Sequence, residues 1–295
     1  MYNPQKHTVG CAWRYFSDQL SNIYAYNELQ AIGNVIFKHF FQLDAAQRIL
    51  LQKDLFPVAS MKVLEEIVLQ LKSFIPVQYI TGVAHFFGLE FEVAPGVLIP
   101  RPETEELVDR MIAYIRKIKT NKNNIHVLDV CTGSGCIAVA LAKEFPGAKV
   151  WACDVSVDAL GIATGNAIKN NVKVQFFHCD VFSGTIELEN LDFVVCNPPY
   201  VTMSEKELMQ PNVLNFEPHQ ALFVSDLDPV LYYRKVSQQA LKLLKPGGML
   251  FFEINENFPQ QTLECVLEQG FENGEIAKDI NCKPRILFAN KPINV

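Results

Sequence analysis

The chain has 295 residues, of which 49% are hydrophobic, and a formal net charge of −6. This length and composition allow one large globular domain or two smaller ones. The acidic balance argues against a broad surface for duplex nucleic acid, because phosphate contacts need clustered Lys and Arg. It favours a protein or a small molecule as the partner.

The N-terminal residues 1–7 lack the apolar run of a signal peptide. No later stretch approaches the roughly 18 uncharged apolar residues that are needed to span a bilayer. We therefore expect a cytoplasmic protein with no membrane partner.

The eight cysteines contain no C-x-x-C pair, so the sequence encodes neither a zinc ribbon nor a thioredoxin motif. Four of them, Cys131, Cys153, Cys179 and Cys196, fall near the C-terminal ends of predicted strands. Burial of small reduced thiols explains this pattern more simply than a metal does. We expect no metal site.

Residues 11 to about 75 are predicted to form a small helical bundle, because apolar residues recur there at helical spacing. The segment Asp44-Ala45-Ala46-Gln47 resembles a capping box at the start of one helix, and Ser60 is the expected cap of another. The bundle has no glycine-rich loop and no convergent polar set, so we expect catalysis elsewhere. We assign residues 1–75 to an N-terminal domain, which could be a packing element or, as we expect, a docking surface for a macromolecular substrate.

Residues 76–103 are predicted to connect two domains. Alternating residues around Gly88 indicate a β-hairpin, and a stiff, proline-dense segment follows. This segment opens a helix from about Thr104 to Lys119. Its Arg101 and Glu105 either line a site or pair with each other at the surface.

From residue 125 onward, the pattern alternates between strand and helix, and residues 104–295 form one predicted domain. Repeated βα units imply a mostly parallel sheet that is covered on both faces. Strands are predicted over 125–130, 149–153, 174–178, 191–196 and 248–254, helices over 137–145, 156–169 and 229–244 with Pro229 first, and a helix and two strands within 262–289. Gly161 and Gly165 weaken the second helix by about 1 kcal/mol each relative to alanine, so we expect close packing there.

The first strand of the sheet ends in a glycine-containing turn, Asp129-Val130-Cys131-Thr132-Gly133-Ser134-Gly135, directly before a helix. In α/β folds this position holds a ligand-binding turn. Asp154 ends the next strand, 19 positions after Gly135, where a carboxylate can accept both hydroxyls of a ribose; the alternative is a cap for the helix at Ser156. Asp180, after the third strand, fits an adenine amine or a purely structural turn equally well.

The fourth strand runs into Asn197-Pro198-Pro199-Tyr200. Proline cannot donate to a strand ladder, so the strand stops here, and the prolines hold the Asn197 side chain and their own carbonyls with little freedom. These acceptors and the aromatic ring suit a planar group that carries an NH2, such as a carboxamide or a nucleobase amine. On these residues alone, a plain strand stop is an equally good interpretation.

Together, the turn, Asp154 and the Asn-Pro-Pro-Tyr segment resemble the S-adenosylmethionine-dependent methyltransferases that modify planar nitrogens. Further segments narrow the resemblance to the bacterial family that methylates the glutamine side-chain amide of peptide chain release factors: residues 76–82, 86–89, 97–105 and 216–218, with Ala221-Leu222. The resemblance covers about residue 60 to the C-terminus, with a helical N-terminal domain in the family's position. It implies a Rossmann-like class I methyltransferase sheet whose last strand is antiparallel.

The resemblance also implies S-adenosylmethionine as the cofactor, S-adenosylhomocysteine as the product, and a release factor as the protein partner. We expect a monomer without direct nucleic-acid recognition. The family usually has glycine where this chain has Cys131. The implied cofactor-binding residues are Asp129, Val130, Cys131, Thr132, Gly133, Gly135, Asp154, Asp180, Val181 and Asn197. The expected substrate-binding residues are Asn197, Pro198, Pro199, Tyr200, Arg101 and Glu217, of which Asn197, Pro198 and Tyr200 are the expected catalytic residues.

An amide nitrogen is a poor nucleophile because its lone pair is delocalised into the carbonyl. Hydrogen bonds from its NH2 to the Asn197 side-chain oxygen and the Pro198 carbonyl are expected to orient it, while Tyr200 packs on the substrate near the positive sulfur. Alkylation makes the proton acidic, so no dedicated base and no metal are expected. The alternatives are a ribosomal-protein glutamine methyltransferase, a methyltransferase for the amino group of adenine or guanine, and a non-enzymatic nucleotide-binding module.

Overall fold

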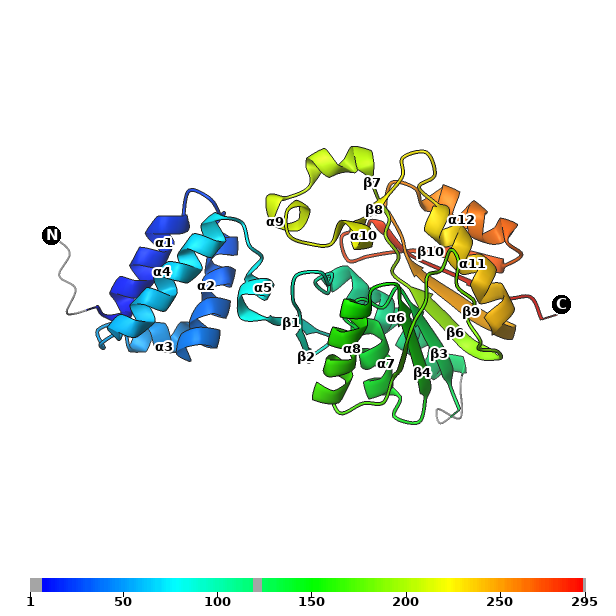
Figure 1. The fold of residues 1–295 in the computed structure, drawn as a ribbon, viewed down its shortest axis with the longest axis horizontal. Coiled ribbons are helices and arrows are strands. Elements are labelled where there is room, and N and C mark those ends of the chain that lie inside the picture. The colour runs from blue at the N-terminus through cyan, green and yellow to red at the C-terminus, as the bar shows by residue number, and fades with distance from the viewer. Residues whose placement is uncertain (1–6, 119–123, 294–295) are drawn as a thin grey trace. The chain divides into compact units, whose positions relative to one another are not determined.

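The computed structural model describes residues 7–118 and 124–293, and Figure 1 shows them as a ribbon. The chain folds into two compact units, each with its own hydrophobic core. The first unit runs to Gly82 and also contains residues 210–216, and the second contains residues 83–209 and 217 onward. Among the described residues, no helix is both long enough and apolar enough to cross a bilayer.

The first unit is helical, which confirms the predicted bundle. A capping box opens its third helix as predicted, with the Asp44 side chain accepting from the Gln47 backbone. The prediction that Ser60 caps a helix is wrong, because that helix begins at Val58, directly after Pro57. The helices of this unit are α1 (Val9–Leu20), α2 (Tyr26–Phe41), α3 (Ala45–Leu50), α4 (Val58–Lys72), α5 (Val77–Thr81) and α9 (Pro211–Leu214).

The second unit opens with the predicted hairpin, in which β1 (Val83–Phe86) pairs antiparallel with β2 (Leu89–Glu92). Its two-residue turn, Phe87 and Gly88, has positive φ at both positions, as tight hairpins require. Glu105 accepts a hydrogen bond from the Phe87 backbone at 2.7 Å and so fastens this turn to the following helix.

That helix, α6 (Pro102–Ile118), begins two residues before the predicted start, because proline is well suited to the first turn of a helix. Lys119, the predicted end, lies outside the described residues.

The core of the second unit is a seven-stranded sheet in the order β10-β11-β9-β6-β3-β4-β5. Its strands are β3 (His126–Val130), β4 (Lys149–Asp154), β5 (Gln175–His178), β6 (Leu191–Cys196), β9 (Leu244–Glu253), β10 (Glu272–Lys278) and β11 (Pro284–Asn290). Strands β5, β4, β3, β6 and β9 are parallel, whereas β11 is antiparallel to both of its neighbours. The mostly parallel sheet with an antiparallel last strand is therefore confirmed.

Helices cover both faces of this sheet (Figure 1). On β6, Phe193 and Val195 pack with one set of helices, and Val194 and Cys196 pack with the other. The first set contains α6 and α7 (Cys136–Glu144), together with Ala167 of α8 (Val157–Lys169), and the second contains α11 (Leu231–Leu243) and α12 (Pro259–Glu268). Burial of both faces explains why the parallel strands are nearly continuous apolar runs.

The structure corrects the predicted start of α11 at Pro229. The helix begins at Leu231, whose backbone donates to Asp228 in a preceding turn. The Asp228 carboxylate also binds the Arg234 guanidinium, with contacts at 2.6 and 3.1 Å. This turn places Pro229 outside the helix.

The order of the strands locates the expected ligand site. The chain adds β4 and β5 on one side of β3 and then returns to add β6 on the other side. The carboxyl ends of β3 and β6 therefore flank a topological switch point, where open α/β sheets bind ligands. The short elements after β6 were not predicted: β7 (Val201–Thr202), the 3-10 helix η1 (Met203–Leu208), α10 (His219–Leu222) and β8 (Phe223–Val224), which pairs with β7.

The two glycines within α8 are not explained by packing, because a Cβ atom added at Gly161 or Gly165 would meet no atom of the described residues within 4 Å. The expectation of close packing is wrong. Since glycine weakens a helix by about 1 kcal/mol relative to alanine, Gly161→Ala and Gly165→Ala are each expected to raise the free energy of unfolding by about 0.5–1 kcal/mol. Urea denaturation followed by circular dichroism measures this. Gly135→Ala, at φ +79° and with Ala163 Cβ at 3.0 Å, is the control that should lose stability; destabilised α8 variants would contradict the prediction.

Candidate active site

Two adjoining cavities lie at the carboxyl ends of the central strands. The larger has a volume of about 300 Å³, which is in the range of small-molecule sites, and the smaller has a volume of about 40 Å³. Four residues line both: Leu98, Arg101, Asn197 and Ala221. Asn197, directly after β6, therefore stands where the two cavities meet.

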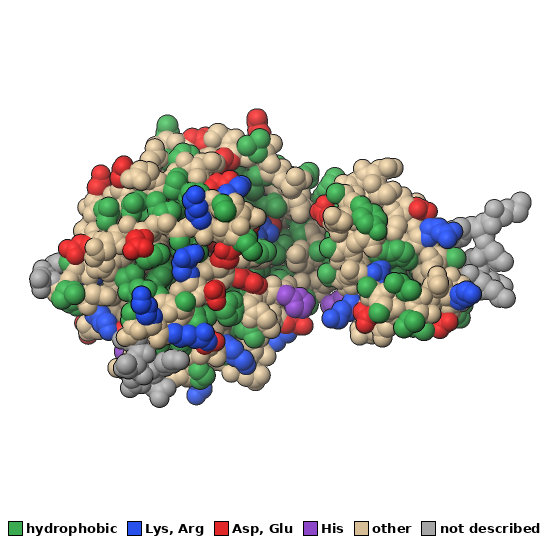
Figure 2. All heavy atoms as spheres, turned by 180° about the vertical axis from the view of Figure 1, so that it is seen from behind, with side chains coloured by type: hydrophobic (Ala, Val, Ile, Leu, Met, Phe, Trp, Pro, Cys, Tyr) green, Lys and Arg blue, Asp and Glu red, His purple; other side chains and the backbone are tan. Residues whose placement is uncertain are grey.

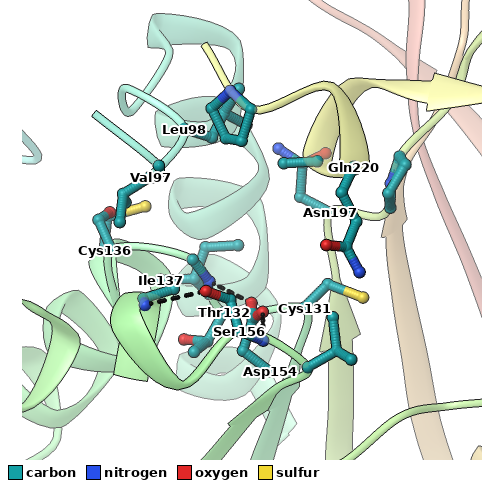
Figure 3. A pocket seen from close by; sticks show the side chains of 18 of the residues that line it. Val97, Leu98, Cys131, Thr132, Cys136, Ile137, Asp154, Ser156, Asn197 and Gln220 are labelled. Carbon is teal, nitrogen blue, oxygen red and sulfur yellow. Dashed lines mark hydrogen bonds between the residues drawn. The ribbon is translucent and has the colours of Figure 1, made fainter. Parts of the chain in front are cut away.

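The predicted glycine-containing turn lines the larger cavity. Cys131 and Thr132 lie at one end of it, beside Asp154 and Ser156 from the next βα connection, and Leu98 lies at the other end (Figure 3). Cys131 has a φ of +60°, a left-handed conformation that glycine adopts more easily than a residue with a side chain. The turn therefore holds a cysteine in a backbone conformation that is less favourable for it than for glycine.

The Asp154 carboxylate is held in place by two backbone donors. Its Oδ2 accepts from Gly133 N at 2.8 Å, and its Oδ1 accepts from Ser156 N at 2.9 Å. Helix α8 is capped by the Ser156 hydroxyl, which accepts from Ala159 N at 3.1 Å, so Asp154 is not the cap. Each carboxylate oxygen has further acceptor capacity for hydroxyl donors in the cavity.

The third strand end adds an aromatic wall to the larger cavity. Asp180 accepts from the Phe182 backbone at 2.9 Å and from the Ser183 hydroxyl at 2.7 Å, and these hydrogen bonds lower the pKa of its carboxyl group. Phe182 and Tyr232 pack edge to face, with ring centroids 4.9 Å apart, and both line the cavity. Such a surface suits a planar base.

Asp129 lies beneath the turn, fully buried. Its Oδ2 accepts from the Thr132 hydroxyl at 2.6 Å and from Ala138 N at 3.2 Å, whereas its buried Oδ1 has no hydrogen-bond partner among the described residues. Burial raises the pKa of this carboxyl group to about 7. An unpaired acceptor at a buried position is unusual, because most buried polar groups are hydrogen-bonded.

This raised pKa predicts a pH-dependent stability. Below about pH 4, Asp129 is protonated in both the folded and the unfolded chain. As the pH rises from about 4 to about 7, only the unfolded chain releases this proton, so the contribution of Asp129 to the free energy of unfolding is lost. Asp129→Asn cannot ionise and can keep an oxygen at the Oδ2 position. Without ligand, the variant is expected to gain roughly 2–4 kcal/mol relative to the wild type between pH 4 and pH 8.

Denaturant titrations of both proteins at pH 5 and pH 8 test this prediction. Asp180→Asn is the control of opposite sign: the pKa of Asp180 is lowered, so its ionised form stabilises the fold and the variant should lose stability as the pH rises. A pH-independent difference between wild type and Asp129→Asn would contradict the assignment.

The smaller cavity is lined by Pro198, Tyr200, Val201, Leu222 and Glu253, beside the four shared residues. Tyr200 lines this cavity and not the larger one, whereas Pro199 lines the larger one. The Tyr200 hydroxyl donates to Glu253 Oε1 at 2.8 Å, and burial raises its pKa well above the ordinary value. Its ring therefore has a fixed orientation.

An ion pair between a partly exposed arginine and a buried glutamate fastens the proline-dense segment that lines the larger cavity. The Arg101 guanidinium binds Glu217, whose carboxylate is buried and also accepts from Ile99 N at 3.1 Å. The alternative pairing of Arg101 with Glu105 is therefore wrong. Arg101 lines both cavities, and Glu217 lines neither, so the structure gives Glu217 a supporting position behind Arg101.

Most of the expected cofactor residues are brought together. The larger cavity is lined by Cys131, Thr132, Gly133, Asp154, Asp180, Val181 and Asn197. Asp129, Val130 and Gly135 do not line it, because they lie in the strand below the turn and at its junction with α7. Over the described ranges 7–118 and 124–293, no group of three or more His, Cys, Asp or Glu side chains could hold a metal ion.

The sequence analysis missed two buried polar residues of the site, Thr104 and Glu253. The Thr104 hydroxyl donates to Glu253 Oε2 at 2.6 Å and accepts from Asn197 Nδ2 at 3.1 Å. Glu253 ends β9, which is parallel to β6. The signal was therefore present: a carboxylate at the C-terminal end of an apolar parallel strand, as for Asp154.

Comparison with known proteins agrees with this architecture. The family model of the methyltransferase small domain matches residues 110–215, and that of the PrmC N-terminal domain matches residues 12–82. Among solved structures, a methyltransferase from Pyrococcus furiosus is similar, with a TM-score of 0.50, 18% identity and coverage of 78% of this chain and 99% of its own. A 16S rRNA N2 G1207 methyltransferase from Thermus thermophilus also has a TM-score of 0.50, with 20% identity and coverage of 71% and 49%. These likenesses confirm the class I methyltransferase fold.

Two curated proteins are similar over nearly the whole chain, and both are named release factor glutamine methyltransferase. The protein from Bacteroides thetaiotaomicron is 41% identical, over 94% of this chain and 98% of its own length. The protein from Flavobacterium psychrophilum is 40% identical, over 93% and 96%. At this identity and coverage, the chain belongs to the release factor glutamine methyltransferase family.

Proposed function

We propose that this protein transfers a methyl group from S-adenosylmethionine to the side-chain amide nitrogen of the glutamine in the Gly-Gly-Gln motif of peptide chain release factors. The observation that carries the proposal is the position of Asn197 between a cofactor-sized cavity and a small cavity lined by acceptors. Family membership supports the choice of substrate, because the relatives bear that name.

The residues of the larger cavity fit S-adenosylmethionine, which supplies a methyl group on a positively charged sulfur. The fixed Asp154 carboxylate, which lines this cavity, suits the ribose hydroxyls. Phe182 and Tyr232 offer aromatic surface for the adenine.

In the smaller cavity, the glutamine amide is expected to donate its two N–H groups to Asn197 Oδ1 and to the Pro198 carbonyl. This orientation presents the nitrogen to the larger cavity and favours localisation of its lone pair. Tyr200, held by Glu253, packs on the amide plane. Alkylation makes the amide proton acidic enough to leave to solvent, so no side chain is needed as a dedicated base.

The helical unit is proposed to dock the release factor. It exposes large apolar side chains, among them Tyr26, Ile49, Leu50 and Leu55, which are 68–79% accessible, and exposed apolar surface is typical of protein-binding faces. On the face shown in Figure 2, acidic and basic side chains are interspersed, as suits a protein rather than a nucleic-acid partner. We further propose that the enzyme acts as a monomer in the cytoplasm.

Incubation of the protein with S-adenosylmethionine and purified release factor tests the function. Mass spectrometry of the digested release factor should find one added methyl on the glutamine of its Gly-Gly-Gln loop. A release factor with that glutamine replaced by alanine is the control and should remain unmodified. Faster methylation of a ribosomal protein or of adenine-containing nucleic acid in parallel reactions would contradict the proposal.

A further inference from the structure

A continuous hydrogen-bonded chain connects Asn197 to a buried carboxylate. Asn197 Nδ2 donates to the Thr104 hydroxyl at 3.1 Å, Thr104 donates to Glu253 Oε2 at 2.6 Å, and the Tyr200 hydroxyl donates to Glu253 Oε1 at 2.8 Å. Thr104 is 2% and Glu253 1% accessible. Burial of a carboxylate to this extent lowers the stability of the fold. Buried ionisable groups of this kind often have a functional role.

This series of hydrogen bonds determines which end of the Asn197 amide faces Thr104. A threonine hydroxyl has a single proton, and an ionised carboxylate only accepts, so the Thr104 proton must point to Glu253. The Thr104 oxygen can then only accept a hydrogen bond from Asn197. The amide group in contact with it must therefore be the NH2 and not Oδ1. The Oδ1 atom is left to accept hydrogen bonds from a substrate.

We propose that Thr104 and Glu253 are positioning residues that fix the donor and acceptor ends of the Asn197 amide, so that the site accepts the NH2 of glutamine and rejects the carboxylate of glutamate. The inference rests on the proposed glutamine methyl transfer and adds to it two residues and a reason for substrate selectivity. A site built to accept from an N–H group discriminates strongly against an analogue that lacks it.

Hydrogen bonds and a nearby cation oppose, but do not cancel, the rise in the pKa of Glu253 that its burial causes. Burial raises the pKa of this carboxyl group, and the hydrogen bonds from Thr104 and Tyr200 and the charge of Arg285 oppose that effect. Thr104 lies in the first turn of α6, so the positive end of the helix dipole lies next to the carboxylate.

Thr104 and Glu253 also tie α6 to β9, so a purely structural role must be distinguished from positioning. Thr104→Val removes the hydroxyl but keeps the shape, and it frees the Asn197 amide to turn over. Thr104→Ser restores the hydroxyl. In Glu253→Gln, the new amide can donate to Thr104, so the Thr104 proton can turn toward Asn197 and favour the wrong amide orientation. Thr262→Val, which removes another fully buried threonine hydroxyl in α12, is the matched control.

The experiment measures kcat, the Kd of S-adenosylmethionine and two affinities for release factor, one with the natural glutamine and one with glutamate in its place as a competitive inhibitor. Thr104→Val and Glu253→Gln are expected to lower kcat by about 100-fold with the cofactor Kd changed by less than about threefold, and to reduce the preference for glutamine over glutamate by at least about tenfold. Thr104→Ser is expected to recover most of both, and Thr262→Val to behave as the wild type.

An undiminished preference for glutamine in Thr104→Val, or equal losses in Thr104→Ser and Thr104→Val, would overturn the inference. If Thr104→Val does not fold, Glu253→Gln and Thr104→Ser decide by the same criteria. Absence of methylation by the wild type would instead overturn the proposed function, and the affinity ratios for the two release factors would still report on the orientation of Asn197.

Discussion

Replacement of Asn197 by alanine is expected to lower kcat for release factor methylation by about 1000-fold. The variant loses the acceptor that orients the glutamine amide at the junction of the two cavities, and loss of one such preorganised contact costs about 10²–10³ in rate. The methyl group then faces an amide that is free to rotate. Formation of S-adenosylhomocysteine under single-turnover conditions measures the effect.

Cofactor binding separates this loss from a disturbed fold. Asn197 contributes one of many lining residues to the larger cavity, so calorimetry should find the Kd of S-adenosylmethionine changed by less than about tenfold. Asn281→Ala, at an exposed position between β10 and β11, is the control and should retain wild-type turnover. Near-normal turnover of Asn197→Ala would remove the basis of the proposed mechanism.

The sequence predicted the sheet and part of the site because both follow from local patterns. Buried parallel strands appear as short apolar runs, and their carboxyl ends meet at one edge of the sheet. A polar residue at the end of such a run, such as Asp154 or Asn197, is therefore expected near the polar residues that end the other strands. This expectation does not require knowledge of the order of the strands. The same rule predicts that Glu253, at the end of β9, lies at this edge of the sheet.

Contacts between distant segments could not be predicted in this way. Thr104 and Glu253 are 149 positions apart, and Arg101 and Glu217 are 116 positions apart. Their pairing depends on how the proline-dense segment folds over the sheet. A sequence pattern showed that Arg101 lies in a stiff loop, but only the structure shows that a buried carboxylate holds it.

The lining of the larger cavity shows that not every residue of a sequence motif contacts the cavity. A motif marks a segment, whereas a cavity is lined by particular side chains of that segment. Val130 belongs to the core of the sheet and Gly135 packs against α8, although both stand in the motif. Phe182 and Tyr232 complete the cavity from outside any motif.

Asp154→Asn is expected to raise the Kd of S-adenosylmethionine by at least about 100-fold. The carboxylate accepts from two backbone donors, Gly133 N and Ser156 N, so an amide in its place must turn its NH2 toward one of them. The variant therefore loosens the turn and also loses acceptor capacity for the ribose hydroxyls. Hydrogen bonds to charged groups contribute about 1.5–3 kcal/mol each, and two of them account for this loss.

A matched control separates this contact from a general charge effect. Asp158→Asn removes the same unit charge from an exposed position in the first turn of α8, four residues further on, and is expected to change the cofactor Kd by less than about threefold. At saturating cofactor, Asp154→Asn should regain a kcat within about tenfold of the wild type, because Asp154 lines only the larger cavity. This is the reverse of the pattern expected for Asn197→Ala. A variant at Asp154 that binds the cofactor normally but turns over slowly would show that the two cavities do not divide cofactor binding from amide positioning.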